Sequence, residues 1–373
     1  MMAKLLSQPK TIQYCGFFNH TGYGQSATSN VLALQSSSKY DVQIQCFHGR
    51  PDKASYDTSV LNILRSMDNK PTNDSAIQIY HCIPDMHRKM RSLNKRISFA
   101  TYETFDPPKH WIKHLNRCHA VFVPSEFNYK TFKKAGLERP IFKIPHTINT
   151  DIWNDEITPF SSNEDVFTFL FVGTWTNRKG CKLLIEAFLK EFSISDNVRL
   201  LIKTNKTDQA SKFVNNTIND IKKQGLPPID FERKVFAEAD MARFVKSAHC
   251  MVLPTMGEGF GLTGAQALAV KVPLIVTNFS GCKEYASEDN STLIEPSGYL
   301  FEHCMDPSPQ FIDKKWPRLK ISDIQRALRF VFENYSLALS KADKGYEKIQ
   351  KEFNYDTFIQ QFDNMIESVY FGD

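Results

Sequence analysis

The residues best suited to chemistry lie in a glycine-rich segment in the second half of the chain. Residues 254–285 read PTMGEGFGLTGAQALAVKVPLIVTNFSGCKEY, and one carboxylate, Glu258, stands between Gly257 and Gly259. Glycines let the backbone approach a ligand closely, and a helix starting after Gly261 presents unpaired N–H groups with a partial positive charge. The segment therefore predicts a cradle for phosphates and sugar hydroxyls.

Two further segments place cations where apolar strands are expected to end. In residues 171–188, FVGTWTNRKGCKLLIEAF, Arg178 and Lys179 lie at the expected start of a helix. Cations there are unfavourable unless they face an anion, which favours a phosphate contact over a solvated loop. Lys203 ends the apolar run RLLIK. Burying a lysine is costly without an anion, so its side chain either reaches outward or points into a ligand cleft.

A third glycine loop follows the first expected strand. Residues 19–30 read NHTGYGQSATSN, in which Gly22 and Gly24 permit a tight turn and Ser26 or Thr28 could cap the next helix. A G-x-G alone is as compatible with an ordinary strand-to-helix turn as with ligand binding. The third glycine of the dinucleotide fingerprint is missing, which disfavours a dehydrogenase.

Composition indicates a globular protein of two domains. The chain has 373 residues, of which 42% are hydrophobic, and its formal net charge is +5. This charge suits an anionic donor or acceptor but is low for a dedicated DNA-binding domain. The eight cysteines are scattered with no CxxC pair, which favours reduced thiols and disfavours a zinc site. With no signal peptide or spanning segment expected, we predict a cytoplasmic protein.

Short apolar runs alternate with amphipathic stretches in both halves of the chain. The expected strands are 11–18, 41–48, 76–83, 96–103, 120–125 and 141–146, followed by 167–173, 197–205, 249–254 and 272–278. Continuous apolar strands separated by helices predict parallel sheets covered on both faces. The polar segment 151–165 is the expected linker, and the chain beyond Ile321 is expected to be helical.

The order of these motifs resembles one enzyme family. FVGTWTNRKG, LLIKTN and PTMGEGFGLTGAQALA resemble the nucleotide-sugar domain of the retaining GT-B glycosyltransferases of family four, among the glycosyl transferases group 1. Residues 101–136 and the sequence IPHTINTDIW resemble the same family's acceptor domain and its exit into the interdomain linker. The resemblance implies an α/β GT-B fold, in which two Rossmann-like doubly wound parallel sheets face an interdomain cleft and C-terminal helices pack back.

The resemblance also implies a division of the chain and of its work. The implied parts are an acceptor domain at 1–150, a linker at 151–165, a nucleotide-sugar domain at 166–350 and a returning helix at 351–373. In the family, the first Glu of a Glu-x7-Glu motif contacts the transferred sugar and the second holds the ribose. Here the first is Glu258, but Gln266 stands at the second position. An amide can still bond a ribose hydroxyl, without the stronger charge-assisted bond.

The family's diphosphate site is also only partly matched. Its Lys corresponds to Lys179, whereas the Arg position holds Thr174, so Arg178 or Lys203 would supply the missing charge. Donor-binding backbone is implied at Gly22, Gly24, Gly259, Phe260, Gly261 and Leu262.

The N-terminal half departs from the family pattern at one strand end. Many relatives have a His there that touches the donor sugar, whereas this chain reads ATYET with Tyr102 and Glu103. We expect Glu103 to face the cleft and either to orient the acceptor or to contact the sugar. His81 is an alternative, although a lone His after an apolar strand is more often a core residue.

The implied activity is transfer of a hexose from a nucleoside diphosphate sugar, such as a UDP or GDP sugar, to a hydroxyl acceptor with retention at the anomeric carbon. The donor is a co-substrate, and no cofactor or metal is implied. Residues 85–134 hold eleven Lys or Arg against four acids, which could meet an anionic membrane, a lipid phosphate or nucleic acid. A solvated helix face is the commoner reason for such a run. The rival functions are a nucleotide-sugar-binding protein that has lost transfer and a glycosyltransferase acting on nucleic acid bases.

Overall fold

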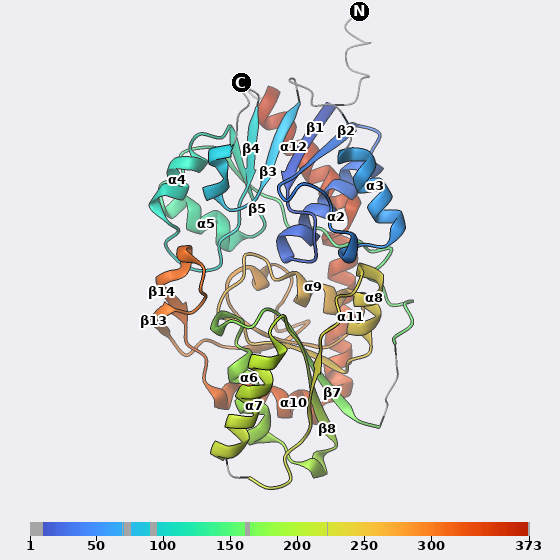
Figure 1. Cartoon of the computed structure of the whole chain (residues 1–373), viewed down its shortest axis with the longest axis vertical. Helices are drawn as coiled ribbons and strands as arrows, with labels where there is room; N and C mark the ends of the chain where they lie inside the picture. The colour runs from blue at the N-terminus through green and yellow to red at the C-terminus, as the bar shows by residue number, and fades with distance from the viewer. Residues whose placement is uncertain are drawn as a thin grey trace, which may run out of the picture.

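The first domain is built on a parallel sheet. The computed structural model describes residues 10–68, 70, 76–89, 95–160, 165–221 and 223–371, which form two sheet domains stacked along the long axis (Figure 1). The first sheet has the order β2-β1-β3-β4-β5-β6 with every pair parallel. Its strands are β1 (Lys10–Gly16), β2 (Tyr40–Cys46), β3 (Ile77–His81), β4 (Arg96–Phe99), β5 (Ala120–Val123) and β6 (Ile141–Lys143). Its helices are α2 (Gly22–Ser36), α3 (Thr58–Asp68), α4 (Lys109–Leu115) and α5 (Glu126–Lys134).

The second domain repeats this plan. Its sheet has the order β12-β11-β10-β7-β8-β9, again all parallel. The strands are β7 (Phe167–Val172), β8 (Val198–Lys203), β9 (Ile229–Glu232), β10 (Cys250–Leu253), β11 (Leu274–Thr277) and β12 (Thr292–Ile294). The helices are α6 (Cys181–Glu191), α7 (Thr207–Ile221), α8 (Glu238–Lys246), α9 (Leu262–Ala269), α10 (Ile321–Glu333) and α11 (Tyr335–Glu352).

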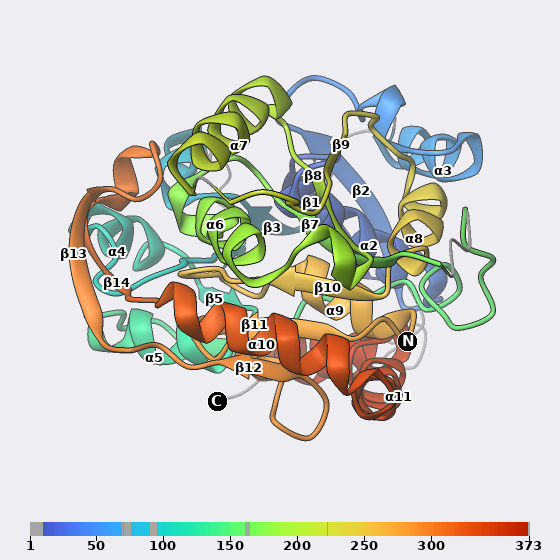
Figure 2. The same cartoon turned by 90° about the horizontal axis from the view of Figure 1, so that it is seen from below.

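An antiparallel hairpin and a returning helix connect the domains. The hairpin, β13 (Tyr299–Cys304) and β14 (Ile312–Pro317), lies at the edge of the molecule beside α4 and α5 (Figures 1 and 2). The last helix, α12 (Tyr355–Phe371), crosses to the first domain, where Phe358 and Phe362 join its hydrophobic core. The predicted domain boundaries themselves stay a prediction.

The predicted parallel sheets are confirmed, because each expected apolar run forms a strand. In β10 all four residues, CMVL, are buried, as a strand covered on both faces requires. The short strands β9 and β12 and the hairpin were not predicted. The hairpin strand β13 is largely exposed, so its sequence carries no buried pattern to indicate it.

One capping prediction was wrong. Helix α2 begins at Gly22, and its N-cap is Thr21, whose hydroxyl accepts from the Gly24 N–H at 3.2 Å. Ser26 and Thr28 lie buried inside the helix. The glycine loop is thus the first turn of the helix rather than a loop before it.

The carboxyl ends of the two sheets meet. The Ser125 hydroxyl, after β5, donates to the Gly259 carbonyl, after β10, at 2.8 Å. In each sheet the chain reverses its direction of winding at one point, between β1 and β3 and between β7 and β10. Ligands of open α/β sheets bind outside the strand ends at such switch points. The fold therefore predicts a ligand site in the loops after these four strands.

The described residues include no helix that is long and apolar enough to cross a membrane. All eight cysteines are free thiols, and six of them are buried.

Candidate active site

The switch point of the second sheet brings the predicted catalytic residues together. Lys179 follows β7 and Glu258 follows β10, and the Lys179 Nζ donates to Glu258 Oε1 at 2.6 Å. Glu258 Oε1 also accepts from the Thr255 hydroxyl at 2.9 Å, and the Glu258 N–H donates to the Ser280 hydroxyl at 2.9 Å. These bonds therefore fix the carboxylate in one orientation where the two domains meet.

The charges around Glu258 keep it ionised. Burial by itself raises the pKa of a carboxyl, but Lys179 and Arg178 hold the pKa of Glu258 below its ordinary value. The side chain of Glu258 is 13% exposed and that of Lys179 is 21% exposed. A partly open, ionised carboxylate beside an ammonium group can bind sugar hydroxyls and a phosphate at neighbouring positions.

Arg178 lies beneath this pair rather than at its surface. Its Nη1 donates to the Gly257 carbonyl at 2.7 Å, its Nε donates to Asp306 at 3.0 Å, and Nη1 lies 3.6 Å from Glu258 Oε2. The residue is 8% exposed. The structure thus joins Arg178 to the cluster but pairs its charge within the protein.

Glu103 faces the same cluster from the first domain. It lies in the loop after β4, and the charges of Arg178, Glu258 and Lys179 all act on the pKa of its carboxyl. Burial raises the pKa of Glu103. No direct hydrogen bond to its carboxyl is found within the described part of the chain, which leaves that group available to a ligand. The expectation that Glu103 faces the cleft agrees with this position.

Gly257 allows the two domains to approach. A Cβ at this position would lie 2.2 Å from the Glu103 carbonyl oxygen. We therefore expect Gly257→Ala to force the domains apart and to lower the free energy of unfolding by about 1–3 kcal/mol, as measured by urea denaturation. Gly22→Ala is the control, because nothing lies within 4 Å of its added Cβ. Equal stability of the Gly257→Ala variant and the wild type would contradict this close contact.

The residues of the predicted backbone cradle lie at the start of α9. Gly261 is its N-cap with φ +89°, a conformation that favours glycine, and Leu262 begins the helix. Phe260 is buried with its ring against His146 and Tyr285. Gln266, one turn along the helix, is 4% exposed, and none of the described residues hydrogen-bonds to its amide. That amide is thus available for the predicted ribose contact.

Of two further predicted donor residues, Thr174 is exposed in the loop after β7 that carries Lys179, and Lys203 lies elsewhere. The Lys203 Nζ donates to the Lys234 carbonyl and lies 4.7 Å from the Phe236 ring centroid. The structure therefore does not bring Lys203 to the Glu258 cluster. Residues 199, 201 and 203 share the half-exposed face of β8, and this alternation turns the lysine towards the loop at 234–236.

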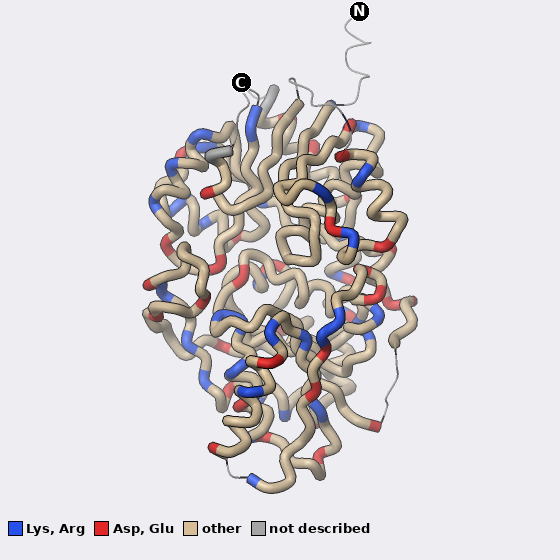
Figure 3. The backbone as a smooth tube through the Cα atoms, viewed as in Figure 1, with Lys and Arg blue, Asp and Glu red and all other residues tan. Residues whose placement is uncertain are grey.

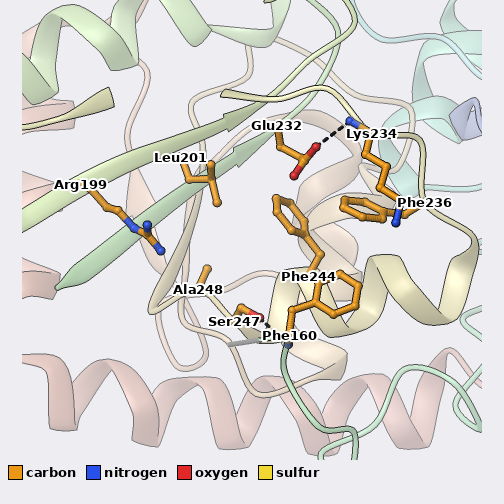
Figure 4. Close-up of a pocket in the computed structure, with 9 residues that line it drawn as sticks. All are labelled: Phe160, Arg199, Leu201, Glu232, Lys234, Phe236, Phe244, Ser247 and Ala248. Atoms are coloured by element: carbon orange, nitrogen blue, oxygen red, sulfur yellow. Dashed lines mark hydrogen bonds between the residues drawn. The ribbon is translucent and has the colours of Figure 1, made fainter. Parts of the chain in front are cut away.

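That loop borders a separate cavity. It has a volume of about 390 Å³ and lies between β8, β9 and α8. Figure 4 shows Phe160, Phe236 and Phe244 on one side of it, with Arg199 reaching in from β8. None of its lining residues belongs to the Glu258 cluster, so the cavity is not part of the candidate active site.

The first glycine loop borders the cluster through Tyr23. This residue lies between Gly22 and Gly24, and its hydroxyl is hydrogen-bonded to Thr101 at 2.5 Å, two residues before Glu103. The charges of Glu103 and Arg178 both act on the Tyr23 phenol. The two glycines therefore lie near the cleft, although their predicted donor contact stays a prediction.

His81 is a core residue. It is fully buried, its Nδ1 is hydrogen-bonded to the Tyr14 hydroxyl at 2.8 Å, and its ring stacks on Phe99 at a centroid distance of 4.4 Å. Burial holds its pKa well below the ordinary value. The commoner of the two interpretations of this residue is thus the correct one.

The basic region at 85–134 presents its cations to solvent. Figure 3 shows Lys and Arg positions along α4 and α5. The exposed cations of the region are Lys95, Lys109, Lys113, Arg117, Lys130, Lys133 and Lys134. The interleaved Trp111 and Leu115 are fully buried in the core. Residue 91 and the side chains of residues 88 and 89 lie outside the described part of the structure. The described part resembles a solvated amphipathic face.

Asp306 is the main site residue that the sequence did not indicate. It lies in the turn of the hairpin, 128 positions from Arg178, and is 6% exposed. No sequence motif indicates Asp306, because its pairing with Arg178 depends on how the hairpin folds against the second domain. Among the described residues, no group of three or more His, Cys, Asp or Glu is arranged to hold a metal ion.

Two parallel sheets facing each other across this cluster define the GT-B class of fold. Solved structures agree. The chain aligns over 96% of its length with all of HepE from Anabaena, crystallised with UDP and glucose, at a TM-score of 0.69 and 12% identity. It aligns over 98% of its length with all of the sucrose-phosphate synthase from Thermosynechococcus elongatus, at a TM-score of 0.66 and 13% identity.

Sequence comparison finds similarity in the second domain. Residues 166–303 match the family model for glycosyl transferases group 1. Over 134 residues the chain is 30% identical to an uncharacterised glycosyltransferase of Methanocaldococcus jannaschii, which is 35% of this chain and 35% of that relative. The match thus spans about a third of the curated relative. In residues 166–303 the chain is therefore similar to the glycosyl transferases group 1.

Proposed function

We propose that the protein is a retaining, metal-independent glycosyltransferase that moves a hexose from a nucleoside diphosphate sugar to a hydroxyl acceptor. The observation that carries this proposal is the Lys179–Glu258 pair, joined at 2.6 Å beside the start of α9. An ammonium group and helix N–H groups suit a diphosphate, and the neighbouring carboxylate suits sugar hydroxyls. The family match and the UDP complex of the similar Anabaena fold support a UDP sugar.

In this proposal the ligand-free pair exchanges partners when the donor binds. Lys179 turns from Glu258 to the diphosphate, and Glu258 accepts hydrogen bonds from the sugar. Glu258 remains ionised because Arg178 stays below it. Gln266 on α9 holds the ribose, and the helix N–H groups from Phe260 to Leu262 complete the cradle.

The transfer step follows from these positions. The bond between the anomeric carbon and the diphosphate oxygen breaks, and the acceptor oxygen forms its bond to the same carbon on the same face. The acceptor proton passes to the leaving diphosphate oxygen. Lys179 and the helix start stabilise the negative charge that develops on the diphosphate. Glu103, in its deprotonated form, accepts a hydrogen bond from the incoming acceptor and orients it, so this role requires a pH above the pKa that burial raises.

Release of nucleoside diphosphate tests the proposal. The protein is incubated with a panel of UDP and GDP hexoses in the presence of EDTA, with and without glycan, lipid-phosphate and nucleic acid acceptors. We expect release from at least one donor, faster with a matching acceptor, and an unchanged anomeric configuration by NMR. Neither binding nor release with any donor would overturn the proposal.

A nucleotide-sugar-binding protein without transfer is the second candidate, because Gln266 replaces the expected carboxylate. Binding without release in the same panel would support it. Contact of the region 85–134 with an anionic membrane or nucleic acid stays a prediction that rests on its exposed cations.

Gln266 gives a separate prediction for affinity. We expect Gln266→Ala to weaken UDP binding by about 5- to 10-fold, the loss of one neutral hydrogen bond of about 1 kcal/mol, measured by calorimetry. Uridine diphosphate keeps the ribose and isolates this contact from the sugar. Gln325→Ala is the control. Gln325 lies on α10, and its Nε2 donates to Glu191 Oε2 at 3.1 Å. Unchanged UDP affinity in the Gln266→Ala variant would remove this residue from the donor site.

A further inference from the structure

Three residues in the turn of the β13–β14 hairpin are buried, although its first strand is exposed. In β13 five of six residues are exposed, and Phe301 is 78% exposed. Met305, Asp306 and Phe311 in the turn are 5%, 6% and 3% exposed. The hairpin thus inserts these three turn residues, an aspartate among them, between the two domains. Burying an aspartate there is unfavourable unless its carboxylate is fully paired.

The Asp306 carboxylate is paired on both oxygens. Oδ1 accepts from the Ser308 N–H at 3.1 Å and from the Ser308 hydroxyl at 2.9 Å. Oδ2 accepts from Arg178 Nε at 3.0 Å. Arg178 and Ser308 hold the pKa of Asp306 below its ordinary value against the opposing effect of burial. The carboxylate is ionised and has one orientation.

Arg178 connects this carboxylate to the glycine turn. Its backbone N–H donates to the Met305 carbonyl at 2.9 Å, and its carbonyl accepts from the Met256 N–H at 2.7 Å. Its Nη1 donates to the Gly257 carbonyl at 2.7 Å. A single guanidinium therefore fixes the hairpin turn against the backbone that carries Glu258.

The same hairpin turn holds the first-domain loop that carries Glu103. The Tyr102 hydroxyl donates to the Gln310 carbonyl at 3.0 Å, and the Tyr102 ring stacks on Phe311 at a centroid distance of 5.6 Å. The Thr104 hydroxyl donates to the Lys315 carbonyl. Both neighbours of Glu103 are thus tied to the hairpin.

We propose that Asp306 is a positioning residue of the active site, which acts by holding Arg178 under the Gly257–Glu258 turn. Arg178 then serves as an internal cation that keeps Glu258 ionised and placed, and Lys179 is the cation that meets the donor diphosphate. This inference rests on the proposed function. The hairpin, although its first strand is exposed, then helps to set the positions of the side chains at the reacting centre.

Asp306→Asn tests the inference, because it removes the charge and keeps the shape. We expect kcat to fall by about 10- to 100-fold, by analogy with residues that orient a ligand-binding side chain, while the donor KM changes by less than about 3-fold. Asp313→Asn is the matched control: it lies on the same hairpin, and its side chain is 74% exposed in a contact with His303.

Urea denaturation confirms folding, and Ser308→Ala, which removes one bond to Asp306, replaces Asp306→Asn if that variant does not fold. For Ser308→Ala we expect a loss of a few-fold, and wild-type kcat in that variant would overturn the inference.

Two readouts separate positioning from a merely structural role. The charged groups that act on Glu103 are Arg178, Glu258, Lys179 and Asp306. Glu103 in turn acts on the neutral phenol of Tyr23. Asp306 raises the pKa of Glu103, so its neutralisation should lower that pKa and move the acid limb of kcat/KM to lower pH. In an Arg178→Met background, Asp306→Asn should cause no further loss.

The outcomes distinguish the two proposals. No turnover by the wild type with any donor would overturn the proposed function and this inference with it. Turnover by the wild type with unchanged kcat in Asp306→Asn, or with a full additional loss in the Arg178→Met background, would overturn this inference alone.

Discussion

Glu258→Gln is expected to lower kcat by about 100- to 1000-fold, the range found when one preorganised group at a reacting centre is removed. Glu258 is the ionised carboxylate at the carboxyl end of β10, where Thr255 and Lys179 both donate to its Oε1. An amide retains the shape but accepts weaker hydrogen bonds from the sugar and carries no charge. Nucleoside diphosphate release at saturating donor measures the loss.

Binding of UDP distinguishes this role from general damage. In Glu258→Gln the Lys179 ammonium loses its internal partner and is free for the diphosphate, so UDP affinity should be kept or increased. Glu186→Gln on α6, paired with Lys190 on the surface, is the control and should retain full activity. A Glu258→Gln variant with wild-type kcat would show that the carboxylate does not act on the sugar.

Lys179→Ala is expected to lower kcat by about 100-fold or more and also to weaken UDP binding, because the leaving diphosphate loses its main cation. Lys190→Ala, on the helix α6 that follows Lys179 and paired with Glu186 at the surface, should behave as the wild type. Lys179 also lowers the pKa of Glu258. Its removal should raise that pKa, so any residual activity that needs ionised Glu258 should be lost at a higher pH than in the wild type. Unchanged UDP affinity would place the diphosphate elsewhere.

The same ion pair has a consequence for stability. A carboxyl whose pKa is lowered on folding stabilises the protein above its unfolded pKa, and this contribution is lost as the pH falls through the folded value. Lys179→Ala should therefore reduce the difference in the free energy of unfolding between neutral and acidic pH. The effect on turnover is nevertheless the larger one, since Arg178 remains beside Glu258.

Much of the fold could be predicted because the strands of buried parallel sheets are continuous apolar runs. The meeting of Lys179 and Glu258 followed from the same pattern, since both come directly after strands whose carboxyl ends share an edge. Glu103 was predicted to face the cleft for that reason as well. These residues are positioned by the sheets themselves.

The remaining features depend on contacts that one sequence does not reveal. Lys203 ends a strand like the others, but the alternation of β8 places it on the half-exposed face with Arg199 and Leu201. The period of two along the strand predicts that the Lys203 side chain shares this half-exposed face and points away from the cleft. Asp306 was missed because its strand neighbours are exposed and its partner is distant. Thr21 was missed because glycines inside a first helical turn resemble a loop.

Titration of UDP into the protein, with EDTA present, tests most directly whether the Lys179–Glu258 cluster is a nucleotide-sugar site. We predict one UDP bound per chain, affinity lost in Lys179→Ala, and affinity kept in Lys190→Ala and Glu258→Gln. A titration in which no UDP binds, or in which Lys179→Ala binds as tightly as the wild type, would contradict the assignment of this cluster to the donor diphosphate.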